Sequence, residues 1–459
     1  MLPSFDEIKK YSTTVCDQIR WKKVHPMIAK EIEDHICDQR DSYLSQGEEE
    51  ETATFNAIKE MGDAVKVGME FDKTYRPKPQ WKLILLTITL MLVGTGVRYI
   101  VYEQEKGTGS FGLASLSFAI IIFFAAYFLD FTFLGKYPVA CYLIMLLTGI
   151  AGFLSSRQVN GRACWFALFG ASISLAYLSL IFPLAYALLI YAMRNKGVRG
   201  ILICGAGYLP YAIILLLVPT TTGFLIYTLS ALITLCAAIT KGWFGIGKRQ
   251  GLMIVLLPTA IVGSAMLLLL QFQSYRMERI RIMLDPFSHP GGYQLVMIRE
   301  MMTGAVFSGE GTMPQQYAGA LSSPWFRTDL ILTALTHKYG WSVFLGIVIL
   351  FFLFTVLAFY KVSKQRSVLG LMVSLSILIV FVLQTFLYVV DNLGYGILTG
   401  LSLPLVSFGK SALFLNAALI GFMLSVFRTG DAMKDNIQTS VKYTPFIVYE
   451  DGKLIINLK

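Results

Sequence analysis

A polar loop between two strongly apolar segments, residues 271–341, holds the side chains that could most readily perform chemistry. In this loop Asp329 follows Thr328 directly and precedes the apolar turns LILTAL. A carboxylate that starts a helix beside a membrane is partly desolvated, which raises its pKa towards the range of a useful general base. Asp329 is therefore the candidate catalytic residue, and the structural alternative is that it only caps the helix.

Basic and polar side chains of the same loop could bind an anionic substrate. Arg281, Arg299 and Arg327 could neutralise a pyrophosphate through charge-assisted hydrogen bonds. Gln294 closes the motif DPFSHPGGYQ at 285–294 in the same loop. Because this polar chemistry lies between two membrane segments, it indicates a site that handles a lipid-borne polar substrate.

Trp165 and Arg98 are candidate substrate contacts near the ends of other apolar segments. Trp165 closes RQVNGRACW (157–165) at the depth where tryptophan favours the membrane interface, so it either anchors the chain or lines a groove for sugar or lipid. Arg98 lies near the end of the first apolar segment, on the same side as the loop. It either extends its head group to water or faces the substrate.

The last apolar segment contains two more candidates, Ser407 and Lys410. Pro404 and Gly409 interrupt this segment, and non-helical backbone survives at membrane depth only where it is buried in protein or lines a wet cavity. Lys410 lies where a helix begins, and the helix dipole disfavours a cation there unless an anion is near. Its side chain therefore either reaches the membrane surface or binds a phosphate.

These residues must be positioned by a bundle of membrane-spanning helices. Of the 459 residues 55% are hydrophobic and the mean hydropathy is +0.61, which excludes a soluble protein. A segment of about 20 apolar residues crosses a hydrocarbon core of about 30 Å as a helix. We expect an all-α, polytopic membrane protein with about ten transmembrane helices behind a small soluble helical domain. The expected spans are 82–101, 112–131, 138–156, 165–193, 201–218, 223–240, 251–271, 342–360, 367–390 and 397–427.

Lysine and arginine in the short loops predict the orientation of these spans. Basic residues gather in alternate loops, for example at 194–199 and 361–366, whereas the loops at 219–222 and 391–396 have none. This bias predicts that both termini are cytoplasmic and that the loop at 271–341 is outside. The net charge of +10 is then mostly a topological signal with affinity for anionic lipid, and no nucleic-acid partner is expected.

Residues 1–78 predict a cytoplasmic helical domain. Ile28, Ile32 and Ile36 recur at four-residue spacing, which would stack them on one helix face. After a break at Gly47, a second helix is expected to end at a glycine C-cap.

The same segment predicts a third helix and a role in binding a partner or in sensing. Asp63, directly after Gly62, is expected to cap a helix that runs through Phe71. The segment 31–65 resembles the short prefix domain found ahead of some bacterial permeases. A role in binding a cytoplasmic partner or in sensing follows from that resemblance. The cluster Asp34, His35 and Asp38 could bind a metal, but a solvated helix face is the interpretation we favour.

The membrane domain, 79–430, resembles the SEDS family of membrane proteins, which includes FtsW, RodA and SpoVE; residues 431–459 would form a cytoplasmic tail. The resemblance extends over about residues 82–428 and rests on motifs in the correct order. The motifs are LDFTFLGKYPVACYL (129–143), VNGRACW (159–165), VPTTTG (218–223), DPFSHPGGYQ followed by SGEG (285–311), TDLILTALTHKYGW (328–341) and DNLGYGILTGLSLPLVSFGKSAL (391–413).

The resemblance implies a bacterial cell-membrane enzyme that polymerises peptidoglycan strands from lipid II, beside a class B penicillin-binding protein, for division, cell shape or sporulation. Asp329 matches the family's essential loop aspartate, which implies a general base for the 4-hydroxyl of the acceptor sugar. Undecaprenyl pyrophosphate would leave with inversion, stabilised by a divalent cation (Mg²⁺ or Mn²⁺) or by arginines. Trp165, Pro404, Ser407 and Gly409 also match family positions.

The sequence departs from the family pattern at several positions. Thr336, His337 and Lys338 stand at the family's Glu-Glu pair, Lys410 replaces a glycine, and 218–223 lacks the family's aspartate. These departures indicate a divergent paralogue. They leave two alternatives to the enzyme: a catalytically inactive scaffold or regulator of cell-wall synthesis, and a flippase for a lipid-linked precursor. A flippase should carry charges at mid-membrane, which these spans nearly lack.

Overall fold

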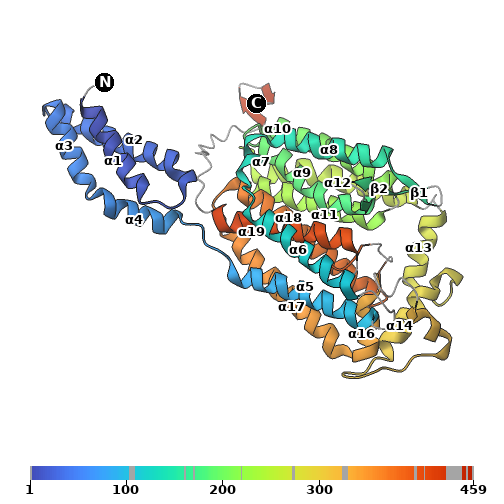
Figure 1. Ribbon diagram of the computed structural model, residues 1–459. Helices are drawn as coiled ribbons and strands as arrows, with labels where there is room; N and C mark the ends of the chain where they lie inside the picture. Colours follow the sequence, from blue (N-terminus) through green and yellow to red (C-terminus); the bar gives the residue numbers. More distant parts are fainter. Residues whose placement is uncertain are drawn as a thin grey trace. The chain divides into compact units, whose positions relative to one another are not determined.

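The structure is a computed structural model in which α-helices dominate (Figure 1). The chain divides into two compact units: one comprises Met1–Pro79 and Phe427–Lys434, and the other Gln80–Val426 and Asp435–Lys459. The residues that the structure describes are 3–102, 109–159, 162–168, 171–218, 220–270, 274–322, 329–396, 401–407, 409–430, 447–450 and 453–456.

The N-terminal unit is a helical bundle with its own core. Its elements are α1 (Pro3–Asp17), the 3₁₀ turn η1 (Lys22–Val24), α2 (His25–Ser45), α3 (Glu50–Met61) and α4 (Ala64–Tyr75). Ile28, Ile32 and Ile36 of α2 are at most 2% exposed, which confirms the predicted apolar face. They pack with residues of α1, such as Ile8 and Val15, in one cluster. The sequence analysis did not predict α1.

The start of α4 is capped as the sequence predicts. The Asp63 carboxylate accepts hydrogen bonds from Val65 N at 2.8 Å and from Lys66 N at 3.1 Å. Gly62 ends the preceding helix with a φ of 81°, a conformation that glycine adopts without strain. Helix α4 ends at Tyr75, one turn beyond the predicted Phe71.

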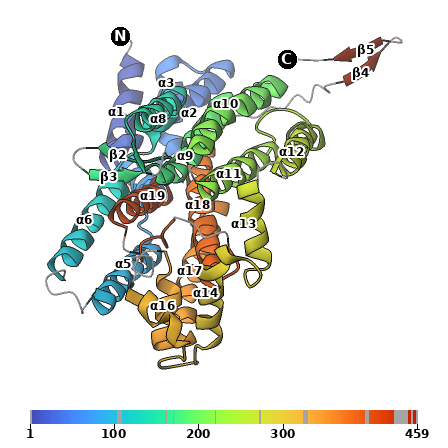
Figure 2. The same ribbon diagram turned by 90° about the vertical axis from the view of Figure 1, so that its right-hand side faces the viewer.

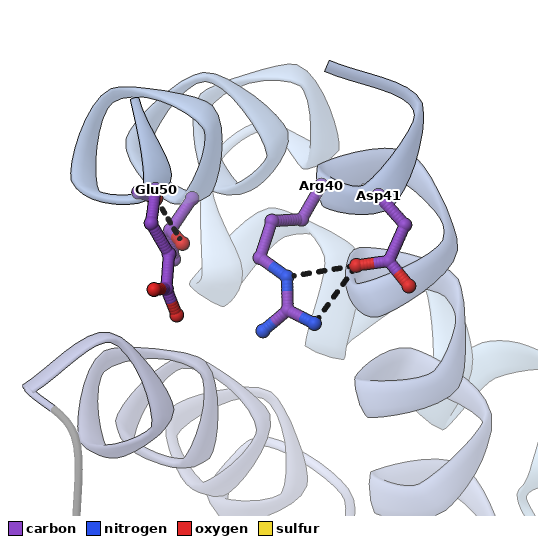
Figure 3. A network of polar contacts seen from close by, with 4 residues as sticks. Arg40, Asp41 and Glu50 are labelled. Atoms are coloured by element: carbon purple, nitrogen blue, oxygen red, sulfur yellow. Dashed lines mark hydrogen bonds and ion pairs between the residues drawn. The ribbon is translucent and has the colours of Figure 1, made fainter. Parts of the chain in front are cut away.

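A polar cluster lies between α2 and α3 (Figure 3). The Arg40 guanidinium donates to Asp41 Oδ1 from Nε at 3.1 Å and from Nη2 at 2.8 Å. This hydrogen bond with Asp41, and more weakly the charge of Glu50, raise the pKa of Arg40. The Asp41 side chain is 62% exposed, so a pair of this kind contributes about 0–1 kcal/mol to stability.

The larger unit has a helix at every position where a span is expected. The helices are α5 (Trp81–Tyr102), α6 (Gly109–Phe128), α8 (Pro138–Leu154), α9 (Leu178–Met193), α10 (Gly197–Leu217), α11 (Thr221–Thr240), α12 (Lys248–Leu270), α17 (Trp341–Ser363), α18 (Val368–Asn392) and α19 (Lys410–Thr429). Within the described residues, six helices are long and apolar enough to cross a membrane: α9 with the preceding turn, α10, α11, α17, α18 and α19. Shorter apolar helices lie in α5, α6 and α8. The predicted class, a helical polytopic membrane protein, is therefore confirmed.

The fourth span begins later than predicted. An antiparallel sheet in the order β1-β2-β3 precedes it, made of β1 (Arg157–Val159), β2 (Arg162–Leu168) and β3 (Ala171–Ser174). The 3₁₀ turn η2 (Leu175–Tyr177) then leads into α9. The single span predicted over 165–193 is therefore wrong at its start. Apolar composition alone does not distinguish a strand from a helix, and residues 162–174 are apolar enough to be taken for either.

Helix α9 is the centre of the larger unit. It packs against α8, α10, α11 and α18, and 83% of its span is buried. Aromatic rings fill the space between these helices; the rings of Phe182 and Tyr211, for example, lie 4.3 Å apart. This packing supports the η2 residues that precede α9.

The last span is interrupted, as the sequence predicts. Residues 401–407 are non-helical and buried, and α19 starts only at Lys410. Helix α5 approaches this segment so closely that a Cβ added at Gly94 would lie 2.6 Å from Leu405 O. Leu405 has a φ of 62°, which is unusual for a residue with a side chain. Non-helical backbone is thus surrounded by protein here.

The loop after α12 folds into short helices that gather at one end of the larger unit's bundle, as Figures 1 and 2 show. They are α13 (Ser274–Leu284), η3 (Pro290–Gly292), α14 (Tyr293–Thr303), η4 (Gln315–Ser322) and α16 (Ile331–Tyr339). The remaining short elements are α7 (Thr132–Lys136) and the antiparallel pair β4 (Ile447–Glu450) and β5 (Lys453–Ile456).

Candidate functional site

Asp329 lies two residues before the first residue of α16, Ile331, and is partly buried. The residue at the N-cap position of α16 is Leu330, which provides no side-chain cap. The structure thus assigns the N-cap position of α16 to Leu330, one residue after Asp329. The local pattern was ambiguous because a helix start is uncertain by one or two residues in sequence.

The first turn of α16 is instead capped by side chains of α18. Ile331 N donates to the Tyr388 hydroxyl at 3.2 Å, and Thr333 N donates to Asn392 Oδ1 at 3.1 Å. The first amides of a helix have no partner within the helix, so they need acceptors of this kind. Tyr388 and Asn392 are at most 1% exposed, and water cannot replace them.

Asn392 also binds the backbone of Asp329 itself. Its Nδ2 donates to the carbonyl oxygens of Asp329 and Tyr388, each at 3.0 Å. The Thr333 hydroxyl donates at 2.9 Å to Asn392 O and lies 3.1 Å from Asn392 Oδ1. The carboxamide of Asn392 therefore uses both its donors and its acceptor oxygen inside the protein.

A second layer of polar groups connects this site to the interrupted span. Leu403 N donates to Ser407 Oγ at 2.7 Å, and that oxygen lies 3.5 Å from the Tyr388 hydroxyl. Ser407, a predicted substrate contact, is 2% exposed and thus lies inside the protein, where it orders the 401–407 segment.

Tyr177 brings the start of α9 to the same place. Its hydroxyl lies 3.1 Å from Ser402 Oγ, and Gln384 Nε2 donates to Ser402 O at 2.8 Å. The Asp329 carboxylate interacts electrostatically with the hydroxyls of both Tyr177 and Tyr388. Asp329 is thus within electrostatic range of buried hydroxyl groups from η2 and α18.

Arg299, predicted to bind pyrophosphate, makes its contacts with protein carbonyls. Its Nε donates to Gly394 O at 2.8 Å and its Nη2 to Met283 O at 3.2 Å. The guanidinium carbon also lies 4.8 Å from the centre of the Tyr395 ring. Arg299 therefore joins α14 to the end of α13 and to the turn that follows α18.

The other predicted contacts of the loop are dispersed. Arg281 is exposed on α13, and Gln294 is half-buried in the first turn of α14. Arg327 lies outside the described residues.

Three predicted contacts come from other segments. The backbone of Trp165 belongs to β2 and pairs with Arg157 and Ser174, and Arg98 lies in the last part of α5. The side chains of Trp165 and Arg98 lie outside the described part of the structure. Lys410 is the exposed first residue of α19.

His337 occupies a buried position two turns beyond Asp329. It is 4% exposed, and its Nε2 has no hydrogen-bond partner among the described residues. Burial lowers the pKa of His337, and the charge of Glu310 partly opposes this effect. Gly311 N donates to His337 O at 2.7 Å, so the SGEG motif lies against the end of α16. A histidine here is neutral at neutral pH, unlike the glutamate pair of the family pattern.

A metal site is not evident in the part of the chain that the structure describes. No group of three His, Cys, Asp or Glu side chains there is arranged to hold an ion, and this includes Asp34, His35 and Asp38 in α2. Asp391, beside Asn392, is 3% exposed and its carboxylate packs closely against Gly396.

Sequence reasoning did not single out Tyr177, Thr333, Gln384, Tyr388 and Asn392. The sequence feature that could have identified them is a polar side chain in an otherwise apolar segment. Such a side chain inside a membrane helix usually faces a partner in the bundle. Tyr388 and Asn392 are four residues apart and hence share one face of α18. That spacing was visible in the sequence, but the identity of the partner, α16, was not.

The sequence model of a family described as "Cell cycle protein" (FTSW_RODA_SPOVE) matches residues 81–431. A probable peptidoglycan glycosyltransferase FtsW from Trichlorobacter lovleyi is 25% identical over 289 residues, 62% of this chain and 72% of the relative. The protein of the same name from Pseudoalteromonas atlantica is 28% identical, over 62% of this chain and 58% of its own length. The protein of the same name from Nitrosomonas europaea is 24% identical, over 76% of this chain and 93% of its own length.

Solved structures share the fold. A chain from work described as "Structural coordination of polymerization and crosslinking by a peptidoglycan synthase complex" superposes with a TM-score of 0.62 at 21% identity, over 76% of this chain and 98% of that chain. The rod shape determining protein RodA of Thermus thermophilus gives a TM-score of 0.55 at 19% identity, over 77% of this chain and 97% of that chain.

Proposed function

The chain belongs to the FtsW/RodA/SpoVE family of cell cycle proteins, and on this premise we propose that it is a peptidoglycan glycosyltransferase. Its substrate is lipid II, and its role is glycan-strand synthesis for division, cell shape or sporulation. Relatives named probable peptidoglycan glycosyltransferases support the reaction class. The buried hydrogen-bond network that fixes the backbone of Asp329 is the observation that supports this residue as the centre of the proposed activity.

Asp329 is the proposed general base. Its carboxylate accepts the proton of the 4-hydroxyl of the acceptor sugar while that oxygen bonds to the anomeric carbon of the donor. The bond between the anomeric carbon and the pyrophosphate oxygen breaks, and its electron pair leaves with undecaprenyl pyrophosphate, so the configuration inverts. The partly buried position of Asp329 beside Tyr177 and Tyr388 supports this role, because partial exclusion of water favours proton acceptance.

Cationic and aromatic side chains are the proposed substrate contacts. Arg281 and Lys410 are exposed, which suits contact with a charged ligand from outside the protein. Arg299 and Ser407 support the site from within, since their described contacts are to protein groups. The remaining proposed contacts are Arg98, Trp165, Gln294 and Arg327.

A divalent cation, Mg²⁺ or Mn²⁺, is proposed to neutralise the pyrophosphate. Mg²⁺ usually keeps several waters and binds through one or two carboxylates together with substrate phosphates. Asp329 is a carboxylate of the required chemistry, but the described residues hold no three-ligand group. The cation would therefore arrive with the pyrophosphate, and a chelator should lower turnover.

Both termini are proposed to be cytoplasmic and the 271–341 loop extracellular. Tyr177, Asp329, Asn392 and Ser402 lie in one network, so the ends of their spans share one side of the membrane. The distribution of lysine and arginine supports an exterior position for that side.

A class B penicillin-binding protein is the proposed partner, and the N-terminal unit is proposed to bind a cytoplasmic protein. The structural similarity to a chain from a peptidoglycan synthase complex supports assembly with a second enzyme.

The test is polymerisation of labelled lipid II by the purified full-length protein in lipid nanodiscs with Mg²⁺ or Mn²⁺, with and without the penicillin-binding partner. Glycan chains from the wild type and none from Asp329→Ala are the expected result. Absence of product from the wild type in every condition would overturn the proposal.

A scaffold without catalysis is the second candidate function. His337 and Lys338 at the family's Glu-Glu position favour it, because they remove two carboxylates near the proposed base. In that case neither wild type nor Asp329→Ala makes glycan, while both still bind the penicillin-binding partner. A flippase is a weaker candidate, since the spans carry few charges away from their ends.

A further inference from the structure

We propose that Asn392, together with Thr333 and Tyr388, positions Asp329 for catalysis by supplying the cap of α16 from another helix; this inference rests on the proposed glycosyltransferase function. Helix starts are usually capped by a side chain of their own segment. Here the cap residue, Leu330, has no polar group, and the acceptors come from α18, 57 and 59 residues further along the chain.

Asn392 is suited to this role because one buried carboxamide meets three backbone groups at once. It binds the carbonyl oxygens of Asp329 and Tyr388 and the amide of Thr333. Its exposed fraction is 0%, so water cannot take over these hydrogen bonds. A smaller side chain at this position leaves all three groups without that partner.

The consequence is that the backbone from the Asp329 carbonyl into the first turn of α16 is held by α18. Asn392 holds the carbonyl oxygen of Asp329, and the amides of Ile331 and Thr333 fix the turn that follows. The amides of Ile331 and Thr333 have acceptors on α18, in contrast to a helix whose first amides are bonded to its own aspartate. A general base must lie within hydrogen-bond reach of its proton, and a displacement of 1 Å can lower the rate about 100-fold.

Arg299 secures the position of Asn392 in turn. Asn392 is the last residue of α18, and Arg299 binds the carbonyl of Gly394, two residues later. A Cβ added at Gly394 would lie 2.7 Å from Arg299 Cγ, so the two residues are in close contact. Arg299 therefore connects the loop helix α14 to the turn after α18, next to the residue that binds Asp329.

The experiment measures kcat and KM for lipid II with the full-length protein in nanodiscs. Thr333→Val keeps the shape of the side chain but removes the hydroxyl that binds Asn392, whereas Thr333→Ser keeps the hydroxyl. Asn392→Ala removes the central carboxamide. Asn416→Ala is the matched control, because Asn416 is 2% exposed and donates to Ala412 O within α19, a helix that supplies none of the described acceptors at the start of α16.

We expect kcat to fall about 100-fold in Asn392→Ala and about tenfold in Thr333→Val, while KM stays within about twofold of wild type. Thr333→Ser and Asn416→Ala should retain wild-type kcat. Hydrogen exchange of the peptide that covers residues 329–336 should accelerate in Asn392→Ala and not in Asn416→Ala.

Several results would overturn the inference. Equal losses in Asn392→Ala and Asn416→Ala, or equal kcat in Thr333→Val and Thr333→Ser, would reduce Asn392 to an ordinary stabilising residue. A wild type without polymerase activity would instead refute the proposed function, and the hydrogen-exchange comparison would still test the cap.

Discussion

Asp63 and Asp329 stand at the starts of helices in the two units of this protein, and their surroundings use them differently. The Asp63 carboxylate accepts hydrogen bonds from two amides of α4. The amides at the start of α16 are bonded to Tyr388 and Asn392 of α18 instead. A cap from its own segment bonds the aspartate carboxylate to the helix amides. A cap from a distant segment bonds those amides to other side chains.

This difference would distinguish a helix-capping aspartate, Asp63, from the proposed general base, Asp329. The four predictions below test this contrast, from the largest expected effect to the smallest.

The largest effect is expected from removing the charge at each aspartate. Asp329→Asn should lower lipid II polymerisation by about 10³-fold, because loss of a general base typically costs about 10²–10⁴-fold. Asp63→Asn should leave the rate unchanged, since asparagine caps a helix as well as aspartate. Steady-state polymerisation by both variants is the measurement. Comparable polymerisation rates in the two variants would contradict the proposed difference in role between Asp329 and Asp63.

The cap from α18 is expected to contribute the next effect. Tyr388→Phe removes the acceptor of Ile331 N, and a buried amide without an acceptor costs about 1–3 kcal/mol of stability. We expect kcat to fall about tenfold through displacement of Asp329. Tyr211→Phe is the control, because its hydroxyl donates to Tyr142 O in the same unit, away from Asp329. It should lose stability without losing kcat; equal kcat in the two variants would contradict the prediction.

The local cap is expected to matter for stability alone. Asp63→Ala should destabilise α4 by about 1 kcal/mol, because both amide hydrogen bonds are lost. Hydrogen exchange of residues 64–75 reports this change, and lipid II turnover should not respond. A fall in turnover would mean that the N-terminal unit controls catalysis. It would contradict the prediction that the Asp63 cap affects stability alone.

The smallest effect concerns the far end of α16. Because burial lowers the pKa of His337 below its ordinary 6.5, the unfolded state binds the proton more readily than the folded state. Stability of α16 should therefore be constant above pH of about 6.5 and fall as the pH decreases below it. His337→Gln, which cannot be protonated, should abolish this dependence. Hydrogen exchange of residues 331–339 between pH 5 and 8 measures it; an unchanged slope in the variant would assign the effect to another group.

Local features of the sequence predicted much of this fold. The four-residue spacing of Ile28, Ile32 and Ile36, the Asp63 cap and the positions of the apolar helices depend on neighbouring residues, and the structure agrees with them. The β-sheet before α9 was missed because hydropathy reports burial in lipid or protein but not the backbone conformation.

The site was less predictable because its bonds join distant segments. Asp329 was identified from its position and from a family resemblance, and its role remains a prediction. Its partners in α18 required knowledge of which helices are neighbours. Arg299 has the charge of an anion-binding residue, yet its described contacts are with carbonyl oxygens, and no sequence pattern distinguishes these two uses.

The distance along the chain between α16 and its cap has a consequence for biosynthesis. The ribosome makes Ile331 and Thr333 well before their partners, which follow 57 and 59 residues later. Until α18 enters the membrane, the first turn of α16 lacks these acceptors and tends to fray. A nascent or truncated chain that stops after α17 therefore lacks the groups that hold the start of α16, so order at this helix start depends on synthesis of the following span.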